Sequence, residues 1–252
     1  MNKLVALLFL LPCVVGCRGA TYRADVGPFF ATGSGDLALQ NAGGSLELGQ
    51  VQNDLDESLG LGDTEVAPYI RLQSDKDRHR LRLHGFGIDA DGSGILTGDY
   101  GGIVAGAVVN TSMELYAIAA NYGYEMWRGE HYRVALGGQL GFYSLDVAAR
   151  SNVGREEVTS SVLAPMPFVE VEGLFGSLTV GANAALMSAD LGDASGRYLD
   201  VEGYARWQVT KEFDVMAGYR YLVLDAYGLA TDRDCDADVD VHGYFFGAGV
   251  KF

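Results

Sequence analysis

Apolar and polar residues alternate with a period of two through much of the chain, as they do in a β-strand with one apolar face. Residues 198–207 show the pattern most clearly. Their apolar face holds Leu199, Val201, Gly203, Ala205 and Trp207, and their polar face holds Asp200, Glu202, Tyr204 and Arg206. A strand of a membrane-spanning β-barrel turns such an apolar face to lipid and such a polar face to the lumen.

The same alternation predicts further strands at residues 65–74, 80–84, 116–126, 132–143, 163–172, 178–186, 213–221 and 240–252. A bacterial barrel normally closes with an even number of strands, so residues 21–56 must supply one more strand, or three. We therefore expect an all-β, antiparallel, up-and-down transmembrane β-barrel of ten strands, with eight and twelve as the alternatives.

The predicted connections alternate in length. Short turns are expected near residues 74–78, 128–130, 175–177 and 210–212, and longer polar loops near 89–110, 150–159, 190–197 and 226–239. Outer-membrane barrels have short periplasmic turns and longer outer loops. The asymmetry favours a barrel over a soluble β-sandwich, which remains the alternative.

The first residues carry an export pattern. Lys3 precedes an apolar run from Leu4 to Val15 that is too short to span a bilayer, which predicts a cleaved signal peptide over residues 1–17. The sequence before Cys17 is similar to a lipobox, so Cys17 is either a lipidation site or an incidental cysteine near an ordinary cleavage site.

Two parts are expected after the signal peptide. Residues 18–64 hold the first strand or strands and an acidic loop, and residues 65–252 form the main barrel. Within the first part, residues 42–49 could form a strand, a plug or a periplasmic extension.

The last predicted strand has the pattern of an assembly signal of outer-membrane proteins. One face carries His242, Tyr244, Phe246, Ala248, Val250 and Phe252. Gly247 stands where such signals usually have a glycine, so we expect Gly247, Val250 and Phe252 to act in assembly. An ordinary edge strand is the alternative.

Together, the signal peptide, the alternating strands over residues 65–252 and the final Phe252 resemble the small outer-membrane barrels represented by the OmpA transmembrane domain and OmpW. The resemblance is architectural and covers most of the chain. It implies a place in the bacterial outer membrane and assembly by the barrel-insertion machinery. We also expect a monomer in contact with outer-membrane lipid and lipopolysaccharide.

Composition narrows the function further. A formal net charge of −15 argues against nucleic-acid binding, which relies on clustered Lys and Arg. Cys13 and Cys17 lie in the export segment and leave only Cys235 in the body, so no intrachain disulfide is expected.

Charged residues of both signs recur on the polar faces of the strands. The basic ones are Arg71, Arg80, Arg82, Arg133, Arg206 and Arg220, and the acidic ones are Glu125, Glu170, Glu172, Asp200, Glu202 and Asp214. In a narrow lumen such charges must pair, and we expect Arg206 to pair with nearby Glu202, Asp200 or another inward acid. Either these residues form a salt-bridged core or they line a polar pore.

No catalytic constellation is evident, and we expect neither an enzyme nor a cofactor. Of the histidines, His79 and His131 fall at predicted turns and His242 on the predicted lipid face. Only His84 is expected to point inward, without a serine motif to pair with. The spacing of Glu170 and Glu172 places them as neighbours on one wall, which needs no acid/base chemistry.

Acidic residues gather in two segments, one with Asp54, Asp56, Glu57, Asp63 and Glu65 and the other with Asp232, Asp234, Asp236, Asp238 and Asp240. Neither has the spacing of a calcium-binding loop, so solvated loops are expected rather than a metal site. If cations do bind, they could bridge to lipopolysaccharide phosphates.

The sequence thus favours a structural or envelope-interaction role. A narrow channel or small-hydrophobe transporter is the alternative, followed by a lipid-modifying enzyme.

Overall fold

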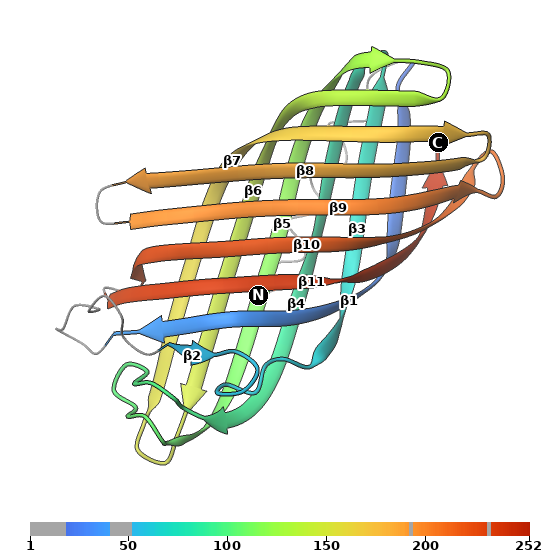
Figure 1. Cartoon of the computed structure of the whole chain (residues 1–252). Helices are drawn as coiled ribbons and strands as arrows, with labels where there is room; N and C mark the ends of the chain where they lie inside the picture. Colours follow the sequence, from blue (N-terminus) through green and yellow to red (C-terminus); the bar gives the residue numbers. More distant parts are fainter. Residues whose placement is uncertain (1–18, 41–51, 192–193, 231–232) are drawn as a thin grey trace.

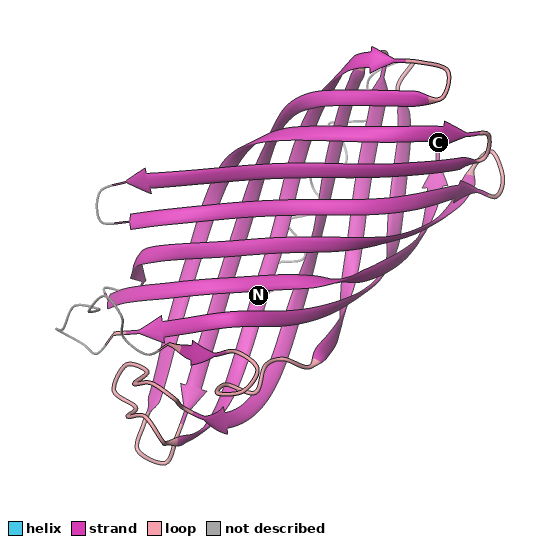
Figure 2. Cartoon of the chain, in the orientation of Figure 1, coloured by secondary structure: helices cyan, strands magenta, loops and turns pink. Residues whose placement is uncertain are grey.

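A computed structural model describes residues 19–40, 52–191, 194–230 and 233–252, and strands make up nearly all of it (Figure 2). Within these ranges no helix is long and apolar enough to cross a bilayer. The strands are β1 (Thr21–Leu39), β2 (Asn53–Asp54), β3 (Thr64–Lys76), β4 (His79–Ile95), β5 (Val108–Arg128), β6 (Tyr132–Arg150), β7 (Arg155–Phe175), β8 (Leu178–Leu191), β9 (Ala194–Gln208), β10 (Phe213–Ala230) and β11 (Arg233–Lys251).

Strand pairing closes the sheet into a barrel. Strands β3 to β11 each pair antiparallel with the next in sequence, and β1 pairs with both β3 and β11. The predicted ten-stranded antiparallel barrel is therefore confirmed, with β1 as the strand expected from residues 21–56 and β2 as a short addition. Backbone hydrogen bonds of 2.9 and 3.0 Å join Tyr22 and Phe252 in both directions at the seam.

Figure 1 shows the barrel as two walls, one in front of the other. Strands β8 to β11 and β1 form one wall, and β3 to β7 cross behind them in the other (Figure 1). The walls meet at two corners, one between β1 and β3 and one between β7 and β8. The corners differ in how far their strands remain paired.

Most of the predicted long loops were wrong. Strands continue through most of residues 150–159 and 226–239, leaving connections at 151–154 and 231–232, and the β8–β9 connection is also short, at residues 192–193. The long loop predicted at 89–110 is present but shorter, since residues 96–107 connect β4 to β5. The predicted short turns are confirmed, and Asp77 in the β3–β4 turn adopts a left-handed φ of 55°, which Asp tolerates better than most residues.

These segments were mistaken for loops because the alternation reverses its sense along each strand. Near the short turns of β5, Tyr122 is exposed and Asn121 is buried. Beyond Tyr116 the outward residues are polar, as at Glu114, and the inward ones apolar, as at Leu115. We call the part with the short turns the turn half and the part beyond the reversal the loop half.

Neighbouring strands reverse at corresponding places. Polar outward residues of the loop half include Asp89, Asp91, Asp146, Thr159 and Ser161, and their inward neighbours include Ile88, Ala90, Val147 and Val158. Such a wall has polar residues toward water and an apolar core, the ordinary pattern of a soluble β-barrel.

The end of the loop half is covered by residues 52–62 and 96–106, which we call the cap. Its buried apolar side chains join the core of the loop half and are Leu55, Leu59, Leu61, Leu96, Tyr100 and Ile103. The Asn53 side chain accepts hydrogen bonds of 3.0 Å from the backbone N–H groups of Thr97 and Gly98, which ties the two cap segments together. A Cβ at Gly92 would lie 2.1 Å from the Gly60 carbonyl oxygen, so this close approach requires glycine.

Candidate functional site in the barrel lumen

The turn half encloses the charged residues of the polar faces. Arg80 of β4 donates hydrogen bonds of 2.8 and 2.7 Å to Glu170 and Glu172 of β7. Arg82 also pairs with Glu170, and the Tyr204 hydroxyl donates to both glutamates at 3.1 and 2.6 Å. The two carboxylates therefore share cationic and hydroxyl donors, so the pair has a structural role.

Arg71 and Glu202 form a second buried pair. Arg71 of β3 and Glu202 of β9 are ion-paired, and the Tyr69 hydroxyl donates a 2.9 Å hydrogen bond to Glu202. The Arg71 guanidinium lies 5.1 Å from the Tyr204 ring centroid and 5.8 Å from that of Phe245. Aromatic faces thus flank a cation that is wholly shielded from solvent.

Arg206 pairs with inward acids other than Glu202 and Asp200. It donates a 2.9 Å hydrogen bond to Asp25 of β1 and lies 3.4 Å from Asp214 of β10. Glu202 and Asp200 are instead held by Arg71 and Arg220. Residues four apart on one strand are separated by about 13 Å, so acids on other strands are the closer partners.

A closed ring of hydrogen bonds crosses the lumen beside these pairs. Arg220 donates to both Asp200 carboxylate oxygens at 3.0 and 2.7 Å, and it lies 2.9 Å from His84 Nδ1. His84 Nε2 contacts Asn121 at 3.0 Å, Asn121 donates to Gln139 at 2.6 Å, and Gln139 donates back to Asp200 at 2.9 Å. We call this set the His84 ring.

The His84 ring assigns a role to both imidazole nitrogens. Because Arg220 can only donate, Nδ1 must accept, and Nε2 carries the proton that is donated to the Asn121 carbonyl oxygen. His84 is therefore neutral here and links β4 to β5 and β10. Its partners include no serine or cysteine nucleophile.

The remaining charges lie toward the turns. Glu125 pairs with Arg128 and lies 3.7 Å from Arg133, which also lies 3.1 Å from Glu172. The Arg133 side chain is 25% exposed, whereas both glutamates are buried. Arg133 therefore sits at the rim of the network rather than deep in the lumen.

Little space is left within the network. A cavity of about 10 Å³ lies among Gln73, Arg80, Arg82, Asn121 and Glu170, together with Gly123 and Phe168. This volume accommodates at most one water molecule. Buried Arg82 Nε and Gln73 Oε1 have no hydrogen-bond partner in the structure and could share it.

The other histidines considered for catalysis lie outside the charged network of the lumen. His79 contacts the Tyr122 hydroxyl at 2.8 Å near a short turn, and His242 lies outward between Tyr219 and Tyr221. His131 is exposed at a turn. Among the described side chains, no group of three or more His, Cys, Asp or Glu could hold a metal ion.

Asp234, Asp236, Asp238 and Asp240 of the acidic run belong to strand β11 rather than to a loop, and Asp232 lies outside the described residues. In the loop half, Asp238 of β11 is directly opposite both Asp36 of β1 and Asp225 of β10. Burial, followed by the charge of Asp225, raises the pKa of Asp238. This row of opposed aspartates lowers stability locally, since like charges directly opposite one another repel.

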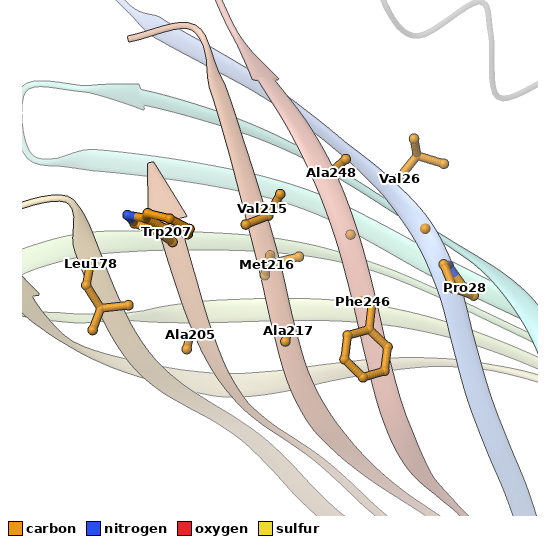
Figure 3. Close-up of a pocket in the computed structure, with 12 residues that line it drawn as sticks. Val26, Pro28, Leu178, Ala205, Trp207, Val215, Met216, Ala217, Phe246 and Ala248 are labelled. Atoms are coloured by element: carbon orange, nitrogen blue, oxygen red, sulfur yellow. The ribbon is translucent and has the colours of Figure 1, made fainter. Parts of the chain in front are cut away.

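The outer wall of the turn half is apolar and contains a hollow of about 590 Å³ between β8 and β1 (Figure 3). Trp207, Phe246 and Val26 flank it, and small residues such as Ala205 and Ala217 form its floor. These side chains point away from the lumen, so the hollow is part of the outer surface.

The expected assembly residues lie at the seam with β1. Val250 and Phe252 are exposed on the outer face, and the Phe252 ring stacks on Tyr22 with centroids 6.0 Å apart. A Cβ on Gly247 would lie 3.6 Å from the Met216 side chain. Cys17, the signal peptide and residues 42–49 lie outside the described residues.

Sequence reasoning missed Arg23 and Asp25 as lumen residues. Asp25 binds Arg206, and Arg23 lies 3.0 Å from Asp214. The signal was present, because Arg23 and Asp25 alternate with Ala24 and Val26 as in the later strands.

Comparison with known proteins supports the fold class without giving a family. No family description and no curated protein matches the sequence. Among solved structures, the outer membrane protease OmpT from Escherichia coli is similar with a TM-score of 0.61 and 12% identity, covering 92% of this chain and 96% of that one. The attachment invasion locus protein Ail of Yersinia pestis matches with a TM-score of 0.39 and 12% identity, covering 93% of this chain and 99% of Ail. The chain thus has the fold of outer-membrane β-barrels.

Proposed function

We propose that this protein is a monomeric, non-enzymatic β-barrel of the bacterial outer membrane, exported by a signal peptide over residues 1–17, that is closed to solutes and interacts with other envelope components. The observation that carries the proposal is the filling of the barrel. Paired charges occupy the turn half, and an apolar core and the cap occupy the loop half.

The outer surface supports a membrane position for the turn half. Exposed apolar side chains cover it, including Leu81, Leu136, Leu140, Val169, Val171, Val180 and Val215. Aromatic residues near the turns include Trp127, Phe175, Trp207, Phe213 and Phe252, and a second set toward the loop half includes Phe30, Tyr116, Tyr219 and Tyr244. Two aromatic girdles flanking an apolar band are typical of outer-membrane barrels. Lipid and lipopolysaccharide would then contact this band.

Planar-bilayer recording tests whether the barrel is closed. We expect no discrete conductance steps under voltage from protein whose folded state is verified by heat-modifiable migration. Reproducible openings would favour the channel alternative and contradict the closed barrel.

The enzyme alternative has its own test. Because both nitrogens of His84 are engaged in the ring, His84→Ala should leave the lipid A of expressing cells unchanged relative to cells with the wild-type protein. Loss of a lipid A modification in the variant would instead support a lipid-modifying enzyme.

Deletion of Phe252 tests the outer-membrane assignment. The deletion removes the Tyr22–Phe252 backbone pair without removing a lumen charge. We expect less inserted barrel and more unfolded protein in the periplasm. Normal insertion and surface exposure would contradict the proposed assembly role of Phe252.

A further inference from the structure

The barrel wall is split at one corner of the loop half. The ladder between β7 and β8 covers only residues 168–175 and 178–185. Beyond it, residues 158–167 of β7 are in register only with β6, and residues 186–191 of β8 only with β9. The two strands diverge from this point, as Figure 1 shows.

The other corner of the barrel is covered. There β2 pairs with residues Asp36 and Leu37 of β1, and residues 58–60 of the cap lie against Gly92 and Gly94 of β4. At the β7–β8 corner the described cap reaches only the outer end of β7, where the Glu156 side chain accepts a 2.8 Å hydrogen bond from the Gly102 N–H group. Among the described residues, no ladder joins residues 158–167 of β7 to β8, so this part of the β7 edge is available for pairing.

The β7 edge is protected at both of its ends, one of which approaches the apolar band. Pro165 and Pro167 lie there with outward-facing Leu163 and Val169, and proline has no N–H group to leave unpaired in lipid. At the other end, Arg155, Glu156 and Glu157 are charged, and charged residues and proline usually prevent edge pairing. Residues 158–163 contain neither, so this water-exposed part of the edge is unprotected.

Side chains at the split alternate in polarity. Val162 and Met187 face inward, are half-buried and pack against the core. Ser160, between Val158 and Val162 on the inward face, is nevertheless exposed, as expected beside an opening. Outward-facing Thr159 and Ser161 are polar and exposed. A matching occupant has apolar groups at every second position and polar groups between them.

We propose that the split between β7 and β8 binds an extended peptide segment of a partner protein, which pairs with the free edge of β7 as an added strand. Backbone N–H and C=O groups at strand spacing satisfy such an edge, whereas an acyl chain cannot. The inference rests on the proposed function, because it requires the loop half to project from the membrane into water.

Binding can be measured with a defined probe. We would use fluorescent nine-residue peptides with Lys at both ends and Val or Tyr alternating with Thr, and record anisotropy with the full chain folded in detergent micelles. We expect saturable binding. The same peptides N-methylated at every second residue should bind at least tenfold more weakly, because they cannot form a ladder.

A pair of variants locates the site. Val162→Asp places a charge on the inward face of the split and should weaken peptide binding at least tenfold. Ser161→Asp adds the same charge to the outward face of the same strand and should leave binding within twofold. Heat-modifiable migration of both variants verifies that they fold.

Isotope-edited infrared spectra should show the bound, carbonyl-labelled peptide in β-sheet geometry. Absence of binding by folded wild type, or equal binding of the N-methylated peptides, would overturn the proposal. Binding of a fluorescent fatty acid with the same Val162 dependence and no peptide binding would instead indicate a lipid port. Since this assay uses micelles and no conductance, its failure is distinct from failure of the closed-barrel proposal.

Discussion

The turn half and the loop half are built from the same strands but bury opposite kinds of residue. In β5 the turn half buries Glu125 and Asn121 and exposes Tyr122, while the loop half buries Leu115 and exposes Glu114. Strand geometry is unchanged across the reversal. The difference therefore indicates a change in what surrounds the barrel, lipid in one half and water in the other.

The two halves are also stabilised by different kinds of interaction. In the turn half, each buried charge relies on a partner across the lumen, and losing one partner leaves the other uncompensated. In the loop half, stability comes from apolar side chains removed from water. Substitutions in the turn half and in the loop half should therefore change the free energy of unfolding in different ways.

The largest effect is expected in the turn half. Arg71→Met leaves Glu202 buried without its cation, which should lower the free energy of unfolding by about 3–5 kcal/mol. Urea unfolding in lipid vesicles measures the change. The double variant Arg71→Met with Glu202→Gln should recover much of it, since replacing both partners is far less costly. A loss below about 1 kcal/mol for Arg71→Met would indicate a wet lumen.

A cavity in the loop half should cost slightly less. Leu115 is fully buried, so Leu115→Ala should lower the unfolding free energy by about 3 kcal/mol. The matched control is Glu114→Ala on the outward face of the same strand, for which we expect a change within about 0.5 kcal/mol. Equal costs for the two variants in the same unfolding assay would contradict an apolar core.

A charge on the outer face should distinguish lipid from water. Leu140→Arg places a cation in the apolar band and should cost about 2–4 kcal/mol. Ala148→Arg lies outward on the same strand in the loop half and should change stability by no more than about 0.5 kcal/mol. A similar penalty at both positions in vesicles would place the loop half in the bilayer as well.

The smallest effect concerns pH. Because the pKa of Asp238 is raised in the folded state, its charge costs stability above that pKa, and the cost disappears as the pH falls through it. Asp238→Asn should therefore stabilise the protein by about 0.5 kcal/mol at pH 7 and have no effect near about pH 3. Unfolding curves of the two proteins at both pH values provide the check, and a gain that persists at low pH would rule out charge repulsion.

Much of the fold could be predicted because period-two alternation depends only on strand geometry. The strands of the loop half could not be predicted in the same way. Their outward residues are polar, as at Asp89, Asp91, Asp236 and Asp238, and such a composition resembles a loop unless the inward residues are considered as well. If Val239 and Val241 had been assigned to the inward face, the last predicted strand would have begun before residue 240.

The lumen partners were only partly predictable. Alternation places Arg206 inside the barrel, but its pairing with Asp25 depends on the closure of β1 against β11 and on strand register. The His84 ring likewise joins residues from widely separated strands. Sequence spacing carries no information about such contacts across a lumen.

Quenching of a fluorophore along the outward face of β6 tests the central claim that the loop half leaves the membrane. Single cysteines at Leu140, Phe142, Asp146 and Ala148, in a Cys235→Ser background, would carry an environment-sensitive label in lipid vesicles. The account predicts quenching by spin-labelled lipid at positions 140 and 142 and by aqueous iodide at 146 and 148. Lipid quenching of comparable strength at all positions would contradict it.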